Sequence, residues 1–277
     1  MKKTTVLLAA GAALVVAKGL DNRLEVTHYT VSSEKIPQEF DGFKISLIAD
    51  LHCDKTAGIA EAIREENPDI ICCPGDMTHD DVPYAPFLNL LKNLVKIAPT
   101  YITSGNHDIW RTDYEELVSV CRDAGAIFLR NERTHITKNG KRIILSGIED
   151  PNCTSYNGIR DAMSAALNKL PEQEEYEILL FHRANLLDML VSKGFDLILS
   201  GHMHGGQIRI PGIGGLMCPK TNIHDKTGII FPKYFGGEYQ RENTKMIVTR
   251  GIGNKAIIPR LFNRPEICTI TLKPKKS

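Results

Sequence analysis

The stretch FKISLIADLH, at positions 43–52, joins a nearly continuous apolar run to two polar side chains that follow it. Such a run is typical of a strand that is buried on both faces of a sheet, as parallel strands are. Asp50 and His52 then fall at the carboxyl end of that strand. Because ligands bind outside the carboxyl ends of strands in open α/β sheets, this stretch predicts both an α/β fold and the place of its site.

The same alternation of apolar runs and amphipathic segments continues along the first two thirds of the chain. Apolar runs predict strands at residues 70–73, 101–103, 143–145, 177–181 and 197–199. Periodic segments predict helices at residues 56–67, 83–97, 112–124, 159–170 and 184–191. Dense glycine and proline predict a loop at 205–237, and further strands are expected at 24–31, 245–249 and 267–272. This order indicates parallel pairing and a layered α/β architecture to which the C-terminal third adds a second sheet.

Composition excludes several classes of protein. The chain of 277 residues carries 34 basic and 33 acidic side chains, so its net charge of +1 creates no overall field toward nucleic acid, and no nucleic acid partner is predicted. A mean hydropathy of −0.17 excludes a polytopic membrane protein. The seven cysteines form no CxxC pair, which argues against a disulfide framework.

Residues 1–20 differ from the rest of the chain. Lys2 and Lys3 precede an uncharged stretch at 4–17. This pattern fits the positively charged n-region and the apolar h-region of a secretory signal peptide. The alternatives are an uncleaved membrane anchor that extends to Leu20, with Lys18 reaching the interface, and a buried helix. We expect a signal peptide or N-terminal anchor at 1–20 and a single domain at 21–277. The expected location is membrane-associated or extracytoplasmic, in a bacterial cell envelope, rather than cytoplasmic.

Polar side chains follow five of the predicted strands, at the ends where parallel strands meet. They are Asp50, His52, Asp76, Asn106, His107, Asp108, His182, His202 and His204. Each alone is weak evidence, because a strand-end Asp is often a turn residue. Together they offer carboxylates, an amide and imidazoles without thiolate, a set that suits divalent metal. The number of ligands exceeds the three or four of one zinc site and fits two ions that share a carboxylate. The remaining histidines, at 28, 79, 135 and 224, fall outside this pattern and are predicted to be ordinary.

In their order along the chain these motifs resemble those of the calcineurin-like metallophosphoesterases. They read Asp50-x-His52, Gly75-Asp76, Gly105-Asn106-His107-Asp108, His182 and Gly201-His202-x-His204. Residues 201–208, 231–234, 250–254 and 264–266 further resemble bacterial membrane-associated phosphodiesterases of the YkuE/YaeI type. The resemblance implies a four-layer α/β/β/α sandwich of two mixed sheets. One departure is visible: many relatives have an acidic residue where His79 stands, and here Asp80 and Asp81 follow one position later.

The resemblance also implies a role for each residue. Asp50, His52, Asp76 and His204 would bind one metal ion, and Asp76 would bridge to a second ion that Asn106, His182 and His202 also bind. His107 would stabilise developing charge and protonate the leaving oxygen, with Asp108 orienting its ring. A metal-bridging hydroxide would attack phosphorus. The expected cofactors are two divalent metal ions, with manganese favoured over iron or zinc.

The implied activity is hydrolysis of a phosphodiester or a pyrophosphate rather than a monoester. The substrate would be a small molecule or a lipid-linked phosphate compound, which the N-terminal segment would let the protein meet at a membrane surface. One alternative is a nucleotide-sugar substrate of the cell envelope, as for a UDP-diacylglucosamine pyrophosphatase. The other is a scaffold that binds metal without catalysis. The sequence does not indicate an oligomeric state.

Overall fold

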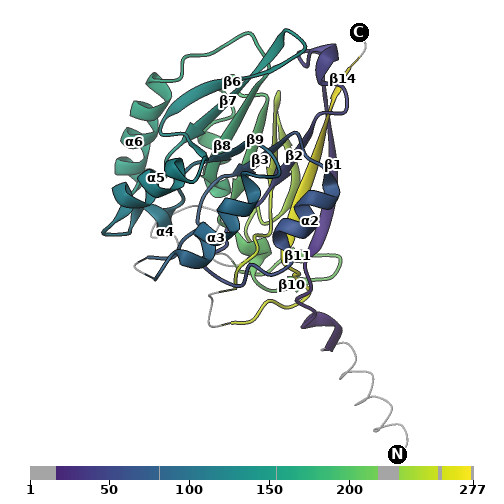
Figure 1. Ribbon diagram of the computed structural model, residues 1–277, viewed down its shortest axis with the longest axis vertical. Coiled ribbons are helices and arrows are strands. Elements are labelled where there is room, and N and C mark those ends of the chain that lie inside the picture. The colour runs from purple at the N-terminus through teal and green to yellow at the C-terminus, as the bar shows by residue number, and fades with distance from the viewer. Residues whose placement is uncertain (1–16, 81, 154, 218–230, 255–257, 276–277) are drawn as a thin grey trace, which may run out of the picture.

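The structure, a computed structural model, describes residues 17–80, 82–153, 155–217, 231–254 and 258–275. Two six-stranded sheets lie face to face, and helices cover the outer face of each (Figure 1). Both sheets are mixed, and the two-sheet α/β sandwich expected from the sequence is confirmed.

The first sheet has the strand order β1-β14-β2-β3-β4-β5. β14 pairs parallel to β1 and antiparallel to β2, and the remaining pairs are parallel. The strands are β1 (Glu25–Ser33), β2 (Lys44–Leu47), β3 (Ile70–Cys73), β4 (Thr100–Ile102), β5 (Ile127–Phe128) and β14 (Glu266–Pro274). The last strand of the chain therefore lies between its first two, which ties the C-terminal segment to the core.

The second sheet has the order β12-β13-β9-β8-β7-β6. Its four central strands are parallel, and antiparallel strands flank them on both edges. The strands are β6 (Glu132–Lys138), β7 (Lys141–Ile148), β8 (Glu177–Arg183), β9 (Leu197–Gly201), β12 (Gly237–Arg241) and β13 (Thr244–Val248). A separate hairpin pairs β10 (Arg209–Ile210) with β11 (Gly214–Gly215).

The helices connect parallel strands and lie on the outer faces. They are α2 (Ile59–Glu66), α3 (Ala85–Leu94), α4 (Asn106–Ile109), α5 (Tyr114–Asp123) and α6 (Tyr156–Asn168), with short 3-10 turns η1 (Gln38–Phe40), η2 (Ala184–Met189) and η3 (His204–Gly206). α2 ends at Asn67, whose left-handed backbone closes the helix ahead of Pro68. Residues 184–191 were expected to form a helix, and the structure has the tighter η2 there.

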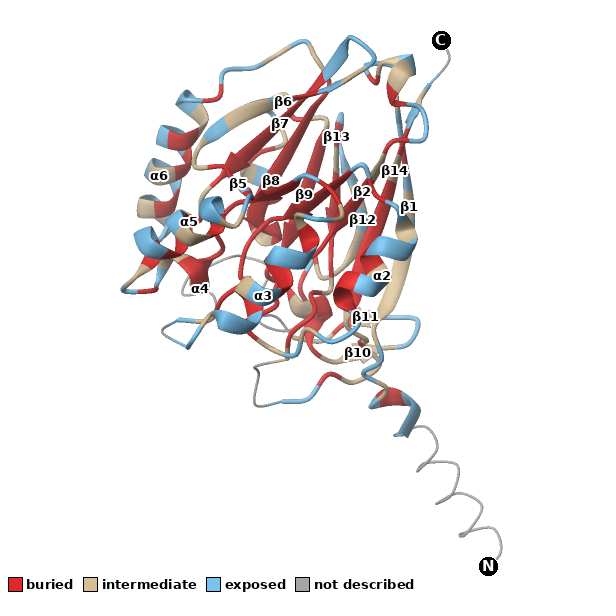
Figure 2. Cartoon of the chain, viewed as in Figure 1, coloured by how far each residue is buried: buried red, intermediate tan, exposed pale blue. Residues whose placement is uncertain are grey.

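Alternating side chains let each central strand serve two cores, because successive residues of a strand point to opposite faces. In β9, Leu197 and Leu199 join the core between the two sheets, whereas Ile198 joins the core under α6. In β3, Cys72 faces the inner core and Ile71 packs under α2 and α3. The central strands are accordingly buried along most of their length (Figure 2). Three stacked apolar cores thus produce four layers and fix both sheets rigidly.

Five of the six cysteines in the described part are buried, so they act as small apolar residues. Cys218 lies outside the described residues, as does most of the predicted signal or anchor segment at 1–20. Within the described ranges, none of the helices has the length and apolar character needed to cross a membrane.

Candidate metal centre

The predicted ligands come together at the carboxyl ends of strands from both sheets. Asp50 and His52 follow β2, Asp76 follows β3, and Asn106 opens α4 after β4. His182 lies within the last residues of β8, and His202 and His204 follow β9. Backbone hydrogen bonds from Asp50 N to Gly75 O (3.1 Å) and from His52 N to Asp76 O (3.0 Å) tie neighbouring strand ends together.

Their ligand atoms form two adjacent groups, Asp50 with His52 and His204, and Asp76 with His182 and His202. In the first group His52 Nε2 lies 3.1 Å from His204 Nε2, and His204 Nε2 lies 3.7 Å from Asp50 Oδ1. In the second, His182 Nε2 lies 3.1 Å from Asp76 Oδ2. The same Asp76 oxygen is 3.9 Å from His52 Nε2 of the first group. Asp76 therefore lies between the two groups.

The donor set fits metal binding. Two ligand atoms that each lie about 2.1 Å from one ion, at a right angle, are about 3 Å apart. The distances His52 Nε2–His204 Nε2 and His182 Nε2–Asp76 Oδ2, both 3.1 Å, match this value. Several ligand atoms are buried without a hydrogen-bond partner among the described residues, among them Asn106 Oδ1 and His202 Nε2. Buried polar atoms are nearly always satisfied, so unpartnered ligand atoms of this kind fit a cation site.

The electrostatics of the site are consistent with a cation. Burial raises the pKa of Asp50 to about 7, which means that its carboxylate lacks a sufficient counter-charge. Burial lowers the pKa of His52 to about 3, so its imidazole is neutral, the form that binds metal. Burial also opposes protonation of His182, but the charge of Asp76 outweighs it and raises the pKa of His182 to about 9. A proton on His182 thus supplies positive charge where a cation would.

Five of the seven predicted ligands have a left-handed backbone: Asp50 (φ 53°), His52 (φ 51°), Asp76 (φ 53°), His202 (φ 74°) and His204 (φ 46°). This conformation is uncommon outside glycine, although Asp and His adopt it more often than most residues. Strain of this kind persists where the surroundings impose it and concentrates at functional sites. The turns at the strand ends are thus shaped to aim side chains inward.

Glycines beside the ligands allow the loops to approach closely. A Cβ atom on Gly105 would lie 2.2 Å from Asp76 Oδ1, and one on Gly75 would lie 2.3 Å from Gly105 N. No larger residue fits at Gly105 without moving Asp76, or at Gly75 without moving the backbone of Gly105. The glycine is therefore required in both motifs for steric reasons.

His107 lies beside this centre and is held by Asp80. Its Nδ1 is 2.7 Å from Asp80 Oδ1, its backbone N–H donates to Asp76 Oδ1 at 2.8 Å, and its ring centroid lies 4.9 Å from that of His52. The half-exposed Trp110 packs edge-on against it with a centroid distance of 4.9 Å. His107 therefore lies at the partly exposed rim of the centre.

The expected role of Asp108 is wrong. Its buried carboxylate accepts hydrogen bonds from Thr78 N (2.8 Å), Thr78 Oγ1 (2.7 Å) and Gly105 N (2.9 Å), and none from His107. Consecutive residues of a helical turn do not face each other, so Asp108 cannot reach the neighbouring ring. It instead ties the loop after β3 to the start of α4, and Asp80 holds His107.

His79 was predicted to be ordinary, and the structure corrects that. Its Nδ1 lies 3.2 Å from His52 Nδ1, and its ring stacks on His107 at a centroid distance of 4.4 Å. His79 lies three residues after the predicted ligand Asp76, in the same loop after β3, and that closeness could have predicted its place near the centre. His28, by contrast, pairs with Glu66 at the surface (2.7 Å), as an ordinary histidine would.

Two further residues that the sequence reasoning missed support the loops. Asn263 is fully buried, and its Nδ2 donates to His204 O (2.7 Å) and Gln207 O (3.1 Å). Asp150, at the end of β7, forms a buried pair with Arg183, the residue after His182 (2.9 Å). Asn263 holds the backbone of a predicted ligand, Asp150 holds the side chain of the residue after one, and neither belongs to a recognisable motif.

Comparisons with known proteins agree with this geometry. The calcineurin-like phosphoesterase family matches residues 43–206, a range that contains every predicted ligand. The chain is 28% identical over 279 residues to the uncharacterized metallophosphoesterase YkuE of Bacillus subtilis, which covers 96% of this chain and 92% of that protein. It is 30% identical over 240 residues to the phosphodiesterase YaeI of Escherichia coli, which covers 83% of this chain and 82% of that protein.

A solved structure, the sulfate thiohydrolase SoxB of Thermus thermophilus in complex with glycerol, has a similar fold. The TM-score is 0.51 at 10% identity, and the match covers 86% of this chain and 57% of that chain. At this identity the likeness concerns the arrangement of helices and strands alone.

Proposed function

The chain belongs to the calcineurin-like phosphoesterase family, and from that membership we propose that it uses two divalent cations to hydrolyse phosphodiesters or pyrophosphates. The observation that carries this proposal is the position of Asp76, whose Oδ2 lies 3.1 Å from His182 Nε2 and 3.9 Å from His52 Nε2. One carboxylate between two sets of imidazoles is the arrangement that a pair of ions requires.

Seven side chains would hold the ions. Asp50, His52 and His204 would bind one, His182, His202 and Asn106 the other, and Asp76 both. When bound, two such ions supply Lewis acidity toward phosphoryl oxygens and a hydroxide nucleophile at neutral pH. The ligand set accepts manganese, iron or zinc, and we favour manganese because hard oxygen donors make up nearly half of it.

His107 would move the proton. Asp80 accepts from its Nδ1, which leaves Nε2 to donate to the oxygen of the departing group. Asp80 would thereby fix both the tautomer and the orientation of the ring. Trp110, stacked edge-on against His107, offers an apolar face for an ester substituent. A diester is the favoured class because it carries such a substituent on each side, and the relative YaeI is named a phosphodiesterase.

The direct test is hydrolysis of bis(p-nitrophenyl) phosphate by the full chain with manganese, compared with the same reaction in a chelator. We expect metal-dependent turnover that exceeds turnover of the monoester p-nitrophenyl phosphate. His107→Ala should keep its bound metal and lose about 10²–10⁴-fold in kcat, because positioned proton transfer contributes that much. His135→Ala, an exposed histidine on β6, is the matched control and should behave like the parent chain.

The same test distinguishes an enzyme from a scaffold that binds metal without catalysis. A protein that binds metal without catalysis would retain two ions per chain by elemental analysis and give no hydrolysis above the chelator control. Undiminished hydrolysis by His107→Ala would remove this residue from the proposed mechanism.

A further inference from the structure

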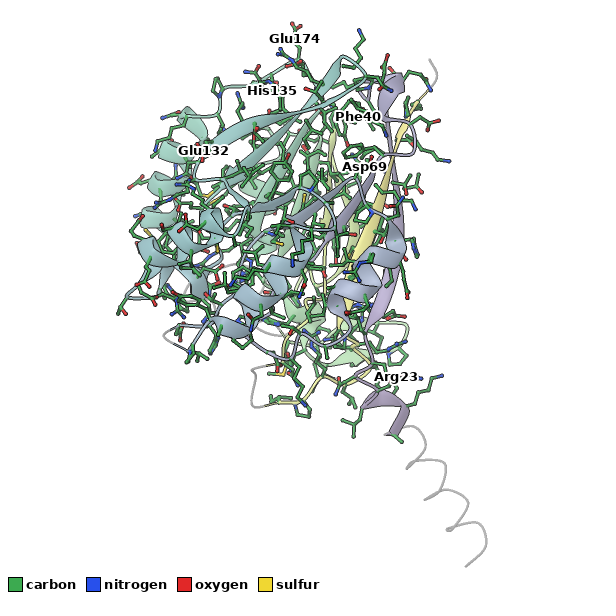
Figure 3. The ribbon with its side chains drawn as sticks, viewed as in Figure 1. Arg23, Phe40, Asp69, Glu132, His135 and Glu174 are labelled. Carbon is green, nitrogen blue, oxygen red and sulfur yellow. The ribbon has the colours of Figure 1, made fainter. Side chains whose placement is uncertain are left out.

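A cavity of about 810 Å³ lies at the end of the molecule where the described chain begins. Its walls come from residues 18–25, from the β10–β11 hairpin and from the segments before β12 and β14. Figure 1 shows the hairpin and the start of the chain at the same end, and Arg23 is labelled there in Figure 3. None of the predicted metal ligands lines this cavity.

The cavity is rich in positive charge. Its cationic lining residues are Lys18, Arg23, Arg209, Arg250 and Arg264, and its acidic ones are Asp21 and Glu25. The acidic pair is already engaged: Asp21 binds Arg23 at 2.8 Å, and Glu25 binds Arg250 at 2.7 Å. Arg209 and Lys18 have no ion pair within the described part of the chain, so positive charge is in excess.

Arg209 is the most informative of these residues. Its side chain is half-buried, and its guanidinium packs on the ring of Phe235, 5.2 Å from the centroid, without a carboxylate partner among the described residues. Arg250, beside it, is already held by two carboxylates: its Nη2 lies 2.7 Å from Glu25 Oε2 and 3.0 Å from Glu266 Oε1. Burying a guanidinium without an acidic partner is costly, so an anion that reached Arg209 would be bound favourably.

A glycine brings the two arginines together. A Cβ atom on Gly236 would lie 3.1 Å from Arg250 Cγ and 3.4 Å from Arg209 Nη1. Both side chains thus converge over a backbone that carries no side chain of its own. Planar guanidinium groups bind phosphate through paired hydrogen bonds, so this floor suits a phosphate group.

The rim of the cavity is apolar, which distinguishes a lipid from a free anion. Ile213, at the turn of the β10–β11 hairpin, is 67% exposed, the highest value among the exposed large apolar residues of the described chain. The sequence that leads into Lys18 is Lys2-Lys3 followed by 14 uncharged residues, 4–17. An apolar tip on a basic cavity, together with an apolar stretch next in the sequence to Lys18, is typical of a surface that lies on anionic lipid.

We propose that this cavity binds the phosphate of an anionic membrane lipid, with Arg209 as its ligand. The apolar leader and Ile213 would enter the lipid layer and bring the cavity level with the head groups. This proposal does not depend on the proposed hydrolysis, because the cavity and the metal centre share no residue.

The test uses the full chain, in a chelator so that hydrolysis plays no part. Flotation measures its partition onto vesicles of phosphatidylcholine alone and onto vesicles that also contain phosphatidylglycerol. The neutral vesicles report binding by the leader, and the excess on anionic vesicles reports the cavity. Arg209→Gln should reduce that excess about fivefold, the effect of one cation at an anionic surface. Arg142→Gln, an exposed arginine on β7 outside the cavity, is the matched control and should keep the excess.

Arg209→Lys separates a built site from diffuse attraction, since it keeps the charge and loses the paired hydrogen bonds. A reduced excess for this variant supports the proposal, and an excess equal to that of the parent chain overturns it. Equal loss in Arg209→Gln and Arg142→Gln overturns it as well. Thermal unfolding of each variant verifies its fold. If inorganic phosphate stabilised the chain through Arg209 while the vesicles gave no excess, the cavity would hold a free anion and the lipid assignment would be wrong.

Discussion

Replacement of Asp80 by alanine should slow the reaction without removing metal. Asp80 touches the proposed proton donor His107 through one hydrogen bond of 2.7 Å and is not among the predicted ligands. Its side chain is 52% exposed, and that of His107 is 23% exposed. The loss of Asp80 should therefore leave the centre intact and free the imidazole to rotate.

The magnitude follows from that hydrogen bond. A hydrogen bond to a charged group contributes about 1.5–3 kcal/mol, and the exposure of Asp80 reduces this toward about 1 kcal/mol. Because about 1.4 kcal/mol corresponds to a factor of ten in rate, kcat should fall about fivefold to tenfold in Asp80→Ala. Asp80→Asn keeps an acceptor without the charge and should fall between that variant and the parent chain.

The assay is steady-state hydrolysis of the chromogenic diester, with bound metal measured in parallel. The decisive arm is the double variant. If Asp80 acts through His107, then Asp80→Ala should have no further effect once His107 is alanine, because coupled residues are not additive. A full additional loss in the double variant, or unchanged kcat in Asp80→Ala alone, would refute the reasoning.

Asp108→Ala should instead lower the stability of the fold, since three buried hydrogen bonds converge on it.

Three other predictions concern the metals and the loop that carries His204. Asp76→Ala should lose both ions and all turnover together, which elemental analysis and the diester assay would reveal; retention of one tightly bound ion would argue against a shared carboxylate. Asn263→Ala should lower the free energy of unfolding by about 2 kcal/mol or more, because two backbone carbonyls lose their donor, and urea unfolding measures this. Manganese at about 100 times its Kd should stabilise the chain by about 2.7 kcal/mol, so a chelator should lower Tm; an unchanged Tm would contradict tight binding.

The sequence predicts the parts of the fold whose burial leaves a clear pattern of apolar residues. β2, β3, β8 and β9 were found because burial on both faces demands apolar runs. β6 and β12 were missed because they are edge strands whose side chains are half-exposed and mostly polar. Each pairs with the strand that directly follows it, β7 or β13, so the signal that was lacking is apolar alternation within the strand itself.

The site divides in a similar way. The spacing of motifs after each strand predicted which nine side chains would gather, and the structure brings them to one end of the two sheets. What the pattern did not determine was which acidic group meets His107. Asp108 is adjacent in sequence but points back to Gly105, whereas Asp80 comes from the loop after β3, 27 positions away. Contacts between loops depend on the backbone conformation of the turn after each strand, and the residue types alone do not determine that conformation.

Left-handed turns at the strand ends link the packing of the sheets to the convergence of the site residues. An aspartate or histidine that follows an extended strand would continue outward unless the backbone reverses, and positive φ values at Asp50, Asp76 and His202 supply that reversal. Each costs on the order of 1 kcal/mol or more, so the rigid sheets beneath must impose them. A bound cation would return part of that energy by neutralising the buried carboxylates. The four-layer core and the metal centre therefore depend on each other: without the packed sheets the ligands would not converge, and without a cation the converged carboxylates would repel.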